Sequence, residues 1–158
     1  MAKKETEVVV SNASPLIFLM QIKKLELLRK LFGKVLITTI VYEEIKNKEQ
    51  KLILQEEIKK GWIRKLKAPK LDVIHDLDMG EASSIALALQ YKKSLFIVDD
   101  MQARRFSESI GLEIIGTIGV LILAKRKKLL SNVLSLLEEA NAFGFWISKK
   151  VYEDIKSL

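Results

Sequence analysis

The chain has 158 residues, of which 49% are hydrophobic and 30% charged, and this length and balance fit a globular protein with a sizeable core. It contains no cysteine, which excludes disulfides, thiolate metal sites and cysteine nucleophiles. The formal net charge is +7; a basic surface attracts polyanions, most commonly nucleic acid, although a lysine-rich solvated surface explains the charge equally well.

Two predicted strands enclose two short helices in the first part of the chain. Residues 7–11 contain three consecutive valines, a β-branched run that predicts a buried strand. Ser14 is placed to cap the following helix, and Pro15 suits the first helical position. The leucine-rich stretch at 16–31 predicts two short helices, and residues 34–38 predict the second strand.

A long helix is predicted next. Thr39 is placed to cap it, its apolar positions run through residues 41–58, and Gly61 ends it. Residues 62–66 follow as a short strand or an extended segment, and residues 76–80 as a loop.

The second half of the chain begins with a helix that Glu81 opens. A strongly apolar strand at residues 94–98 ends in two aspartates, and the helix after it, at 102–110, ends at Gly111. The remaining predicted elements are a strand at 112–115 and helices at 117–128, 132–140 and 148–155.

Strands alternate with helices along the chain, and the strands are near-continuous apolar runs. This pattern is typical of a parallel sheet that is covered on both faces. We therefore predict a three-layer α/β fold with a central, mostly parallel sheet and helices on both faces. The chain has no internal repeat, low-complexity linker or visible boundary, so we expect residues 1–158 to form a single domain.

Polar side chains follow two of the predicted strands, at the sheet edge where sites form in open α/β folds. Asn12 follows the first strand, and Asp99 and Asp100 follow the strand at 94–98. Adjacent carboxylates at the end of a buried strand repel each other and lose hydration, and a divalent cation such as Mg²⁺ or Mn²⁺ relieves both penalties. Alternatively, one aspartate caps the next helix while the other is solvated.

Glu81 is a further candidate, because it lies in the first turn of a predicted helix. The helix dipole favours an acid there without any function. However, Ile85 and Leu89 follow at spacings of four and eight residues, so Glu81 continues an apolar stripe. Its side chain is therefore expected to point along the sheet rather than straight into water.

Two neighbouring acids, Glu43 and Glu44, are separated by their phase on the predicted helix. At about 100° per residue, Glu43 falls almost opposite the face that carries Val41 and Ile45, whereas Glu44 lies on the edge of that face. Glu44 is thus the better site candidate, and Glu43 is predicted to be a solvated surface acid. The alternative for Glu44 is a boundary acid paired with a lysine.

His75 is the only histidine, which excludes a three-histidine zinc site. A Ser-His-Asp arrangement would need His75, and no G-x-S-x-G motif accompanies it, so we interpret it as a surface loop residue. The seven glycines are scattered, and they form no loop that could cradle a phosphate.

Several segments together resemble PIN-domain proteins. The four that carry acids or the first strand end are VVSNASPLI (9–17), VYEEI (41–45), MGEASSIALA (79–88) and FIVDDMQAR (96–104). Two more, IIGTIGVL (114–121) and AFGFWIS (142–148), resemble one branch of the family, a group of uncharacterised prokaryotic proteins related to VapC-type toxins. The resemblance spans nearly the whole chain and rests on the order and spacing of the segments.

The resemblance implies a metal-dependent ribonuclease, in which several acids hold one or two Mg²⁺ or Mn²⁺ ions and RNA phosphodiesters are hydrolysed. The catalytic residues that it implies are Glu44, Glu81, Asp99 and Asp100, and the metal ligands are these four with Asn12. For substrate binding it implies Arg104 and Arg105, which follow the acid pair, and Ser14, which otherwise caps its helix. The basic run at 125–128 is another phosphate-binding candidate, or an ordinary cationic helix end.

The family also implies partners. We expect RNA as substrate, an antitoxin protein encoded next door, and a second copy of the chain in a homodimer. The longest apolar run, residues 118–124, is too short to cross a membrane, and no signal-peptide core follows the N-terminus, so we expect a cytoplasmic protein with no membrane contact.

One residue departs from the family pattern. Aspartate is usual where this chain has Asn12, and a neutral amide is a weaker ligand for a hard cation. Four carboxylates remain, and some members of the branch share the asparagine. The sequence therefore predicts either an active endoribonuclease, the toxin of a toxin–antitoxin pair, or a catalytically weakened PIN domain that binds RNA or protein. A receiver or other phosphoryl-transfer domain is a third reading, and the late position of the aspartate pair argues against it.

Overall fold

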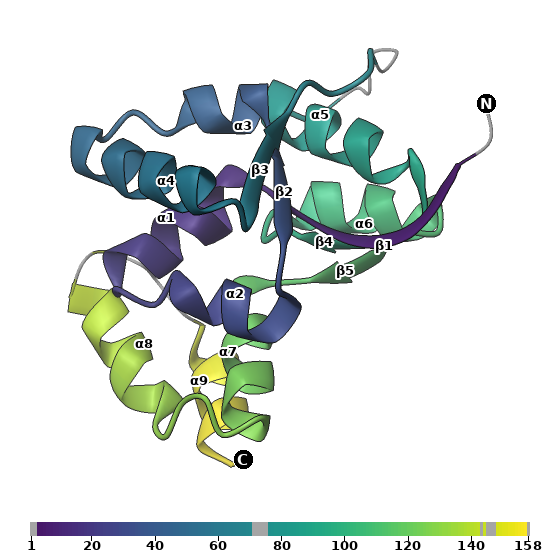
Figure 1. Ribbon diagram of the computed structural model, residues 1–158. Coiled ribbons are helices and arrows are strands. Elements are labelled where there is room, and N and C mark those ends of the chain that lie inside the picture. Colours follow the sequence, from purple (N-terminus) through teal and green to yellow (C-terminus); the bar gives the residue numbers. More distant parts are fainter. Residues whose placement is uncertain (1–2, 71–75, 143, 145–147, 158) are drawn as a thin grey trace.

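The computed structural model describes residues 3–70, 76–142, 144 and 148–157 (Figure 1). Within them, five parallel strands form one sheet in the order β3-β2-β1-β4-β5. The strands are β1 (Lys4–Ser11), β2 (Val35–Thr38), β3 (Ile63–Leu66), β4 (Tyr91–Ile97) and β5 (Glu113–Ile115). His75 lies outside the described residues, so its place in a surface loop stays a prediction.

The helices pack on both faces of this sheet (Figure 1). They are α1 (Ala13–Gln21), α2 (Glu26–Phe32), α3 (Thr39–Glu44), α4 (Lys48–Lys60), α5 (Met79–Ala88), α6 (Met101–Ser109), α7 (Thr117–Arg126), α8 (Val133–Ala142) and α9 (Lys149–Lys156). Strand side chains alternate between two cores: Ile37 and Ile97 point to the core that contains α1, α2, α4 and α7, whereas Val10 and Phe96 point to α5 and α6. The predicted three-layer α/β fold is confirmed.

The strand order places a change of direction beside the central strand. The chain passes from β1 outwards to β2 and β3, then returns to β4 on the other side of β1 and continues to β5. Backbone bonds extend the pairing past the strand ends, since Asn12 N donates to Ile97 O at 3.0 Å and Val98 N donates to Ile115 O at 3.0 Å. In open α/β sheets, ligands bind beside such a switch point at the carboxyl ends of the strands, which here are β1 and β4.

The predicted single helix from residue 39 to residue 60 is wrong, because the chain forms two helices there. The N-cap of α3 is Thr38, whose Oγ1 accepts from Val41 N at 3.0 Å. After Glu44 the backbone becomes extended at the fully buried Ile45, and Asn47 starts α4 by accepting from Gln50 N at 3.0 Å. This second cap and the burial of Ile45 stop the first helix. Gly61 ends α4 in the left-handed conformation, as predicted.

The predicted cap at Ser14 is also wrong. The first helix begins at Ala13, directly after β1, so Asn12 holds the N-cap position and the exposed Ser14 lies inside the first turn. Similarly, α5 begins at Met79 with Asp78 as its cap, two residues before the predicted start at Glu81. Among the described residues, every helix falls short of the length and apolarity that crossing a bilayer requires.

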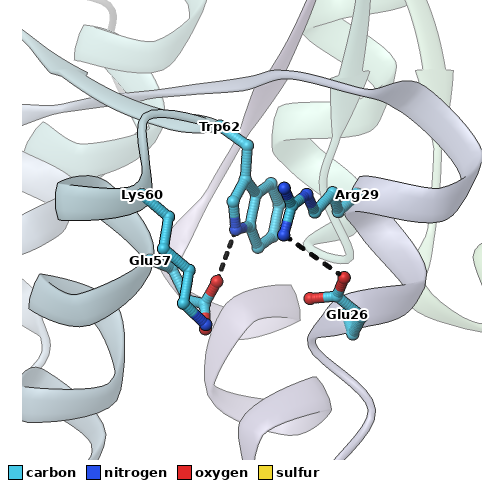
Figure 2. Close-up of polar contacts among 5 residues, drawn as sticks. All are labelled: Glu26, Arg29, Glu57, Lys60 and Trp62. Carbon is cyan, nitrogen blue, oxygen red and sulfur yellow. Dashed lines mark hydrogen bonds and ion pairs between the residues drawn. The ribbon is translucent and has the colours of Figure 1, made fainter.

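A polar cluster joins α2, α4 and the start of β3 (Figure 2). The indole N–H of Trp62 donates to Glu57, Lys60 lies 2.9 Å from the other oxygen of Glu57, and Arg29 lies 3.7 Å from Glu26. Burial alone would raise the pKa of Glu57, but the bonds from Trp62 and Lys60 outweigh it, so this pKa is lowered. The bond from Trp62 to Glu57 connects the start of β3 to α4, and the charge of Arg29 on α2 acts on the same carboxylate.

Candidate active site

Asn12 lies at the carboxyl end of β1, in the centre of the sheet. Its side chain is 5% exposed, and its Oδ1 atom is the one buried side-chain polar atom in the described part of the chain that has no hydrogen-bond partner. Although Asn12 holds the N-cap position of α1, its side chain makes no cap bond. Leaving a buried carbonyl oxygen unpaired costs about 1–3 kcal/mol. Oδ1 is therefore available to bind a ligand.

Glu81 lies in the first turn of α5, in a reciprocal pair with the helix cap. Asp78 Oδ1 accepts from Glu81 N at 2.8 Å, and Glu81 Oε2 accepts from Asp78 N at 3.1 Å. The residue is 7% exposed. Burial, against the bond from the Asp78 N–H and together with the negative charges of Asp78, Asp100 and Glu44, raises the pKa of Glu81 to about 7. Acids from three separate segments therefore act on one buried carboxyl group.

Glu44 ends α3, and its side chain lies against the start of α5. The N–H of Gly80 donates to the Glu44 carboxylate, and a Cβ atom at position 80 would overlap that carboxylate. Burial, and then the charge of Asp78, raise the pKa of Glu44 above its ordinary value. Its neighbour Glu43 points away and pairs with Lys51 at 3.4 Å. The structure thus places Glu44, and not Glu43, beside α5.

The two adjacent aspartates after β4 point to different partners. Asp100 caps α6 by accepting from Ala103 N at 3.0 Å, and its charge acts on Glu81. Asp99 instead caps α7, because its Oδ1 accepts from Thr117 N at 2.8 Å and its Oδ2 from Thr117 Oγ1 at 2.5 Å. Consecutive residues of an extended chain point to opposite sides, so the pair does not act as one chelating unit. Asp100 joins the acids around Glu81, and Asp99 does not.

The predicted substrate-binding residues come from two helices, α1 and α6. Arg104 Nη1 would be 2.7 Å from a Cβ at Gly116, and Asp99 Oδ1 would be 3.1 Å from the same atom, so the guanidinium lies beside Asp99 at the start of α7. Arg105 is exposed on α6, and Ser14 is exposed in the first turn of α1. The basic run at 125–128 is at the opposite end of α7, as expected of cations at a helix C-terminus.

Three residues of this region were missed from the sequence. Asp78 and Gly80 surround Glu81, and Thr117 binds Asp99. The D-x-x-E spacing of Asp78 and Glu81 is the pattern of a capping box and is visible in the sequence. A glycine inside a predicted helix, such as Gly80, is unfavourable for the helix and therefore indicates a packing or functional requirement. No local sequence pattern predicts the contact between Thr117 and Asp99, because the two residues are 18 positions apart in the chain.

The chemistry of the donors fits a hard divalent cation, although the acids do not form a preformed chelate. Among the described residues, no three acidic or histidine side chains are grouped closely enough to hold a metal ion. The unpartnered Asn12 oxygen and the buried Glu81 carboxyl are nevertheless groups that a cation would stabilise, because it supplies a partner to the first and offsets the like charges around the second. The fit therefore rests on these two residues and not on an acidic triad.

A parallel sheet in this strand order, with acids at its switch point, defines a PIN-type α/β domain. The family model described as the PIN domain (DUF3368) matches residues 8–158, and the chain belongs to this family. A solved structure entitled "Structure of the PIN domain endonuclease Utp24" is similar, with a TM-score of 0.50 and 16% identity over 68% of this chain and 83% of that chain. At this identity the likeness shows the fold alone. No curated protein matches the chain.

Proposed function

We propose that this protein is a divalent-cation-dependent endonuclease that hydrolyses RNA phosphodiester bonds. The observation that carries the proposal is the unpartnered, buried Oδ1 of Asn12 at the switch point, on a sheet edge where Glu81 is buried among other acids. Burying the Glu81 carboxylate beside the like charges of the exposed acids Glu44, Asp78 and Asp100 is costly, and a cation bound during the reaction offsets that cost. Membership of the PIN family and the likeness to a PIN endonuclease support a nuclease in particular.

The proposed ligands are Asn12, Glu81 and Asp100. When bound, Mg²⁺ or Mn²⁺ would supply Lewis-acid activation of a phosphate and of water. The chain itself orients these groups: Asp78 fixes the Glu81 carboxylate by their reciprocal bonds, and the Gly80 N–H holds Glu44 next to it. Thr117 holds Asp99, which leaves Asp99 as a positioning residue beside Arg104. Arg104 and Arg105 are the proposed phosphate contacts, since a planar guanidinium suits phosphate oxygens.

The cellular role follows from the resemblance to VapC-type proteins and from the charge. A net charge of +7 suits a polyanionic substrate such as RNA. We infer that the protein is a toxin and that a bound antitoxin protein inhibits its nuclease activity. A homodimer and a place in the cytoplasm belong to the same proposal. The mass of the purified protein in solution tests the homodimer. Inhibition of RNA cleavage by the product of a neighbouring gene tests the antitoxin.

Cleavage of a mixed RNA substrate with and without Mn²⁺ tests the activity. We expect cleavage that needs the cation and that falls by about 100-fold or more in Glu81→Gln and in Asp100→Asn, because each change removes a charged ligand. Glu43→Gln is the matched control, because Glu43 is exposed and points away from α5. Cleavage that is unchanged in both site variants, or that EDTA does not affect, would rule the proposal out.

A second candidate function is a PIN domain that binds RNA or protein without cutting. The neutral Asn12 and the lack of a carboxylate triad among the described residues favour it. Under this alternative the native chain does not cleave RNA, and Asn12→Asp creates cleavage by adding a carboxylate where the amide now lies. Under the main proposal, native protein cleaves and the same change alters the rate only a few-fold. The native rate, measured first, decides between the two.

A further inference from the structure

The sheet is open between β1 and β2, towards the amino ends of these strands. β1 pairs with β4 at every position from Glu7 to Ser11, but with β2 it pairs only at Val10, opposite Leu36. From that pair the two strands diverge (Figure 1). A cavity of about 630 Å³ lies in the gap, which we call the β1–β2 wedge. It is lined by residues 7–9 of β1 on one side and by Lys34, Leu36 and Arg64 on the other.

The edge of β1 that faces the wedge has backbone groups with no strand opposite them. Asn12 N donates to Ile97 O on β4, and the backbone groups of successive strand residues point to opposite sides. Those of residues 8 and 10 therefore point to β4, and those of Val9 and Glu7 point to the wedge. Because β2 meets β1 only at Val10, the Val9 N–H and both backbone groups of Glu7 lack a partner strand. Such an edge is a template for pairing with another chain.

The two faces of the wedge differ in their side chains. Val9 and Phe32 are apolar and belong to the core on the side of α1 and α2. Arg64 pairs with Leu36 in register and therefore shares its face, on the side of α5 and α6. Lys34 lies two positions before Leu36 and lines the same wedge. One face thus offers apolar contacts, and the other offers cations.

The net charge of the wedge is positive. Lys34 and Arg64 are exposed, and neither forms an ion pair with another described residue. Glu7, the acid that lines the wedge, lies 3.8 Å from Lys93 on β4. An acidic ligand would supply the partners that the two cations lack.

We propose that an extended segment of a partner protein, in which acidic and apolar residues alternate, binds in the β1–β2 wedge as an added strand. Its backbone bonds to the free groups of Glu7 and Val9. Because strand side chains alternate between faces, its apolar residues meet Phe32 while its acids meet Lys34 and Arg64. The wedge lies at the amino ends of the strands and the candidate active site at their carboxyl ends, so this inference does not depend on the proposed nuclease function.

The free backbone edge favours a peptide over RNA and over a second copy of the chain. A peptide backbone carries the donors and acceptors that complete a strand ladder, and RNA does not. The wedge is closed at the Val10–Leu36 pair, and its three free residues span about 10 Å, so it admits one short segment and not the edge of another sheet. A net charge of +7 also opposes self-association.

Fluorescence anisotropy with a labelled peptide of alternating valine and glutamate tests the inference. We expect Lys34→Glu and Arg64→Glu each to raise the Kd by about 5-fold or more, because an attraction becomes a repulsion. A peptide of alternating valine and lysine should show the opposite preference and bind the double variant better than the native protein. Lys59→Glu is the matched control, because Lys59 is exposed on α4 and does not line the wedge.

Two measurements test whether the segment binds as a strand. N-methylation of alternate peptide bonds removes donors from the probe and should raise its Kd by about 10-fold or more. In hydrogen exchange followed by NMR, the amides of Glu7 and Val9 should exchange faster than those of Val8 and Val10 in the free protein. The bound peptide should slow exchange at Glu7 and Val9.

Three results would each overturn the inference: no measurable binding of the acidic peptide, equal affinity in both charge-reversal variants, or exchange at Glu7 and Val9 that the peptide does not slow. RNA that displaces the peptide would assign the wedge to nucleic acid instead. Dimerisation that Arg64→Glu abolishes would assign it to a second copy, and either result refutes the proposal. Absence of RNA cleavage would refute the nuclease proposal alone, because the two sites lie at opposite ends of the strands.

Discussion

Asn12 has a neutral amide where a carboxylate of similar size would carry a negative charge, and this difference in charge affects how the site binds a cation. It is buried, its backbone N–H is bonded to Ile97, and its side-chain oxygen has no partner within the described residues. A carboxylate at this position would add another negative charge to an edge where three charges already act on Glu81. The amide keeps an oxygen donor there without that repulsion, at the cost of a weaker bond to a hard cation.

Glu81 gives a prediction that needs no substrate. Its pKa in the folded protein is about 7, against 4.5 for an ordinary glutamate, so between these values the folded chain keeps a proton that the unfolded chain has lost. The free energy of unfolding should therefore fall as pH rises from about 4.5 to about 7, by about 2 kcal/mol in the presence of EDTA. Urea titrations across this range measure the fall.

Two variants separate the contribution of Glu81 to this slope from that of other groups. Glu81→Gln cannot titrate and should flatten the slope, whereas Glu43→Gln, on the exposed side of α3, should leave it as in the native protein. A slope that persists in Glu81→Gln would show that burial does not perturb this carboxyl group.

Among the elements, the short helix α3 connects the sheet to the acids. Its cap, Thr38, is fully buried; it accepts from Val41 N, and its Oγ1 lies 2.8 Å from Ser83 Oγ on α5. One hydroxyl thus joins the end of β2 to the helix that ends in Glu44 and to the helix that carries Glu81. Glu44 is the last residue of α3 and contacts Gly80, and the backbone becomes extended directly after it, at Ile45.

The junction at Thr38 predicts a coupled loss of stability and activity. Thr38→Val keeps the shape but removes both hydroxyl contacts, and it leaves Ser83 short of one partner in a buried place. We expect a loss of about 1–3 kcal/mol in the free energy of unfolding, and RNA cleavage lowered by 10-fold or more as Glu44 and Glu81 lose their common support. Denaturant titration and a cleavage assay measure the two effects.

The matched control is the other cap in the same stretch. Asn47 is exposed and caps only α4, so Asn47→Ala should cost about 1 kcal/mol and leave cleavage unchanged. If Thr38→Val is equally harmless to activity, the junction does not position the acids.

At the scale of the whole molecule, the sheet brings distant segments together. The residues that act on Glu81 come from positions 44, 78 and 100 of the chain: Glu44 ends the helix after β2, Asp78 caps α5, and Asp100 follows β4. Helix α7 starts at the carboxyl ends of the strands, where Thr117 binds Asp99, and leads to α8 and α9, which Figure 1 shows in its lower part. These three helices contribute to the core with α1 and α2.

We propose that this core unfolds with the sheet as one unit. Leu121 on α7 is 0% exposed, and Leu121→Ala should lower the free energy of unfolding by about 2–5 kcal/mol. Circular dichroism and tryptophan fluorescence should then give a single, coincident transition in native and variant protein. Leu123→Ala is the control, because Leu123 lies on the same helix, only half-buried and outside the core cluster. Two separate transitions would divide the chain into independent units.

Sequence pattern was enough to predict the order of the strands, most of the helices, the ends of two helices at Gly61 and Gly111, and the three-layer arrangement. These depend on local apolar spacing and on the backbone preferences of single residues, which the chain carries wherever it folds. The sequence also placed Asn12, Asp99 and Asp100 directly after strands, and parallel strands have only one carboxyl edge. The break between α3 and α4 was missed, since the burial of Ile45 depends on packing against the rest of the core.

The partner of each polar side chain depends instead on how distant segments pack. This packing directs Asp99 to Thr117 and Asp100 towards Glu81, although the two aspartates are neighbours in the chain. It also leaves the Asn12 oxygen unpaired and places Gly80 against Glu44. The pairing of side chains from distant segments depends on distances that packing fixes to within an ångström or two, and a local pattern contains no information about those distances.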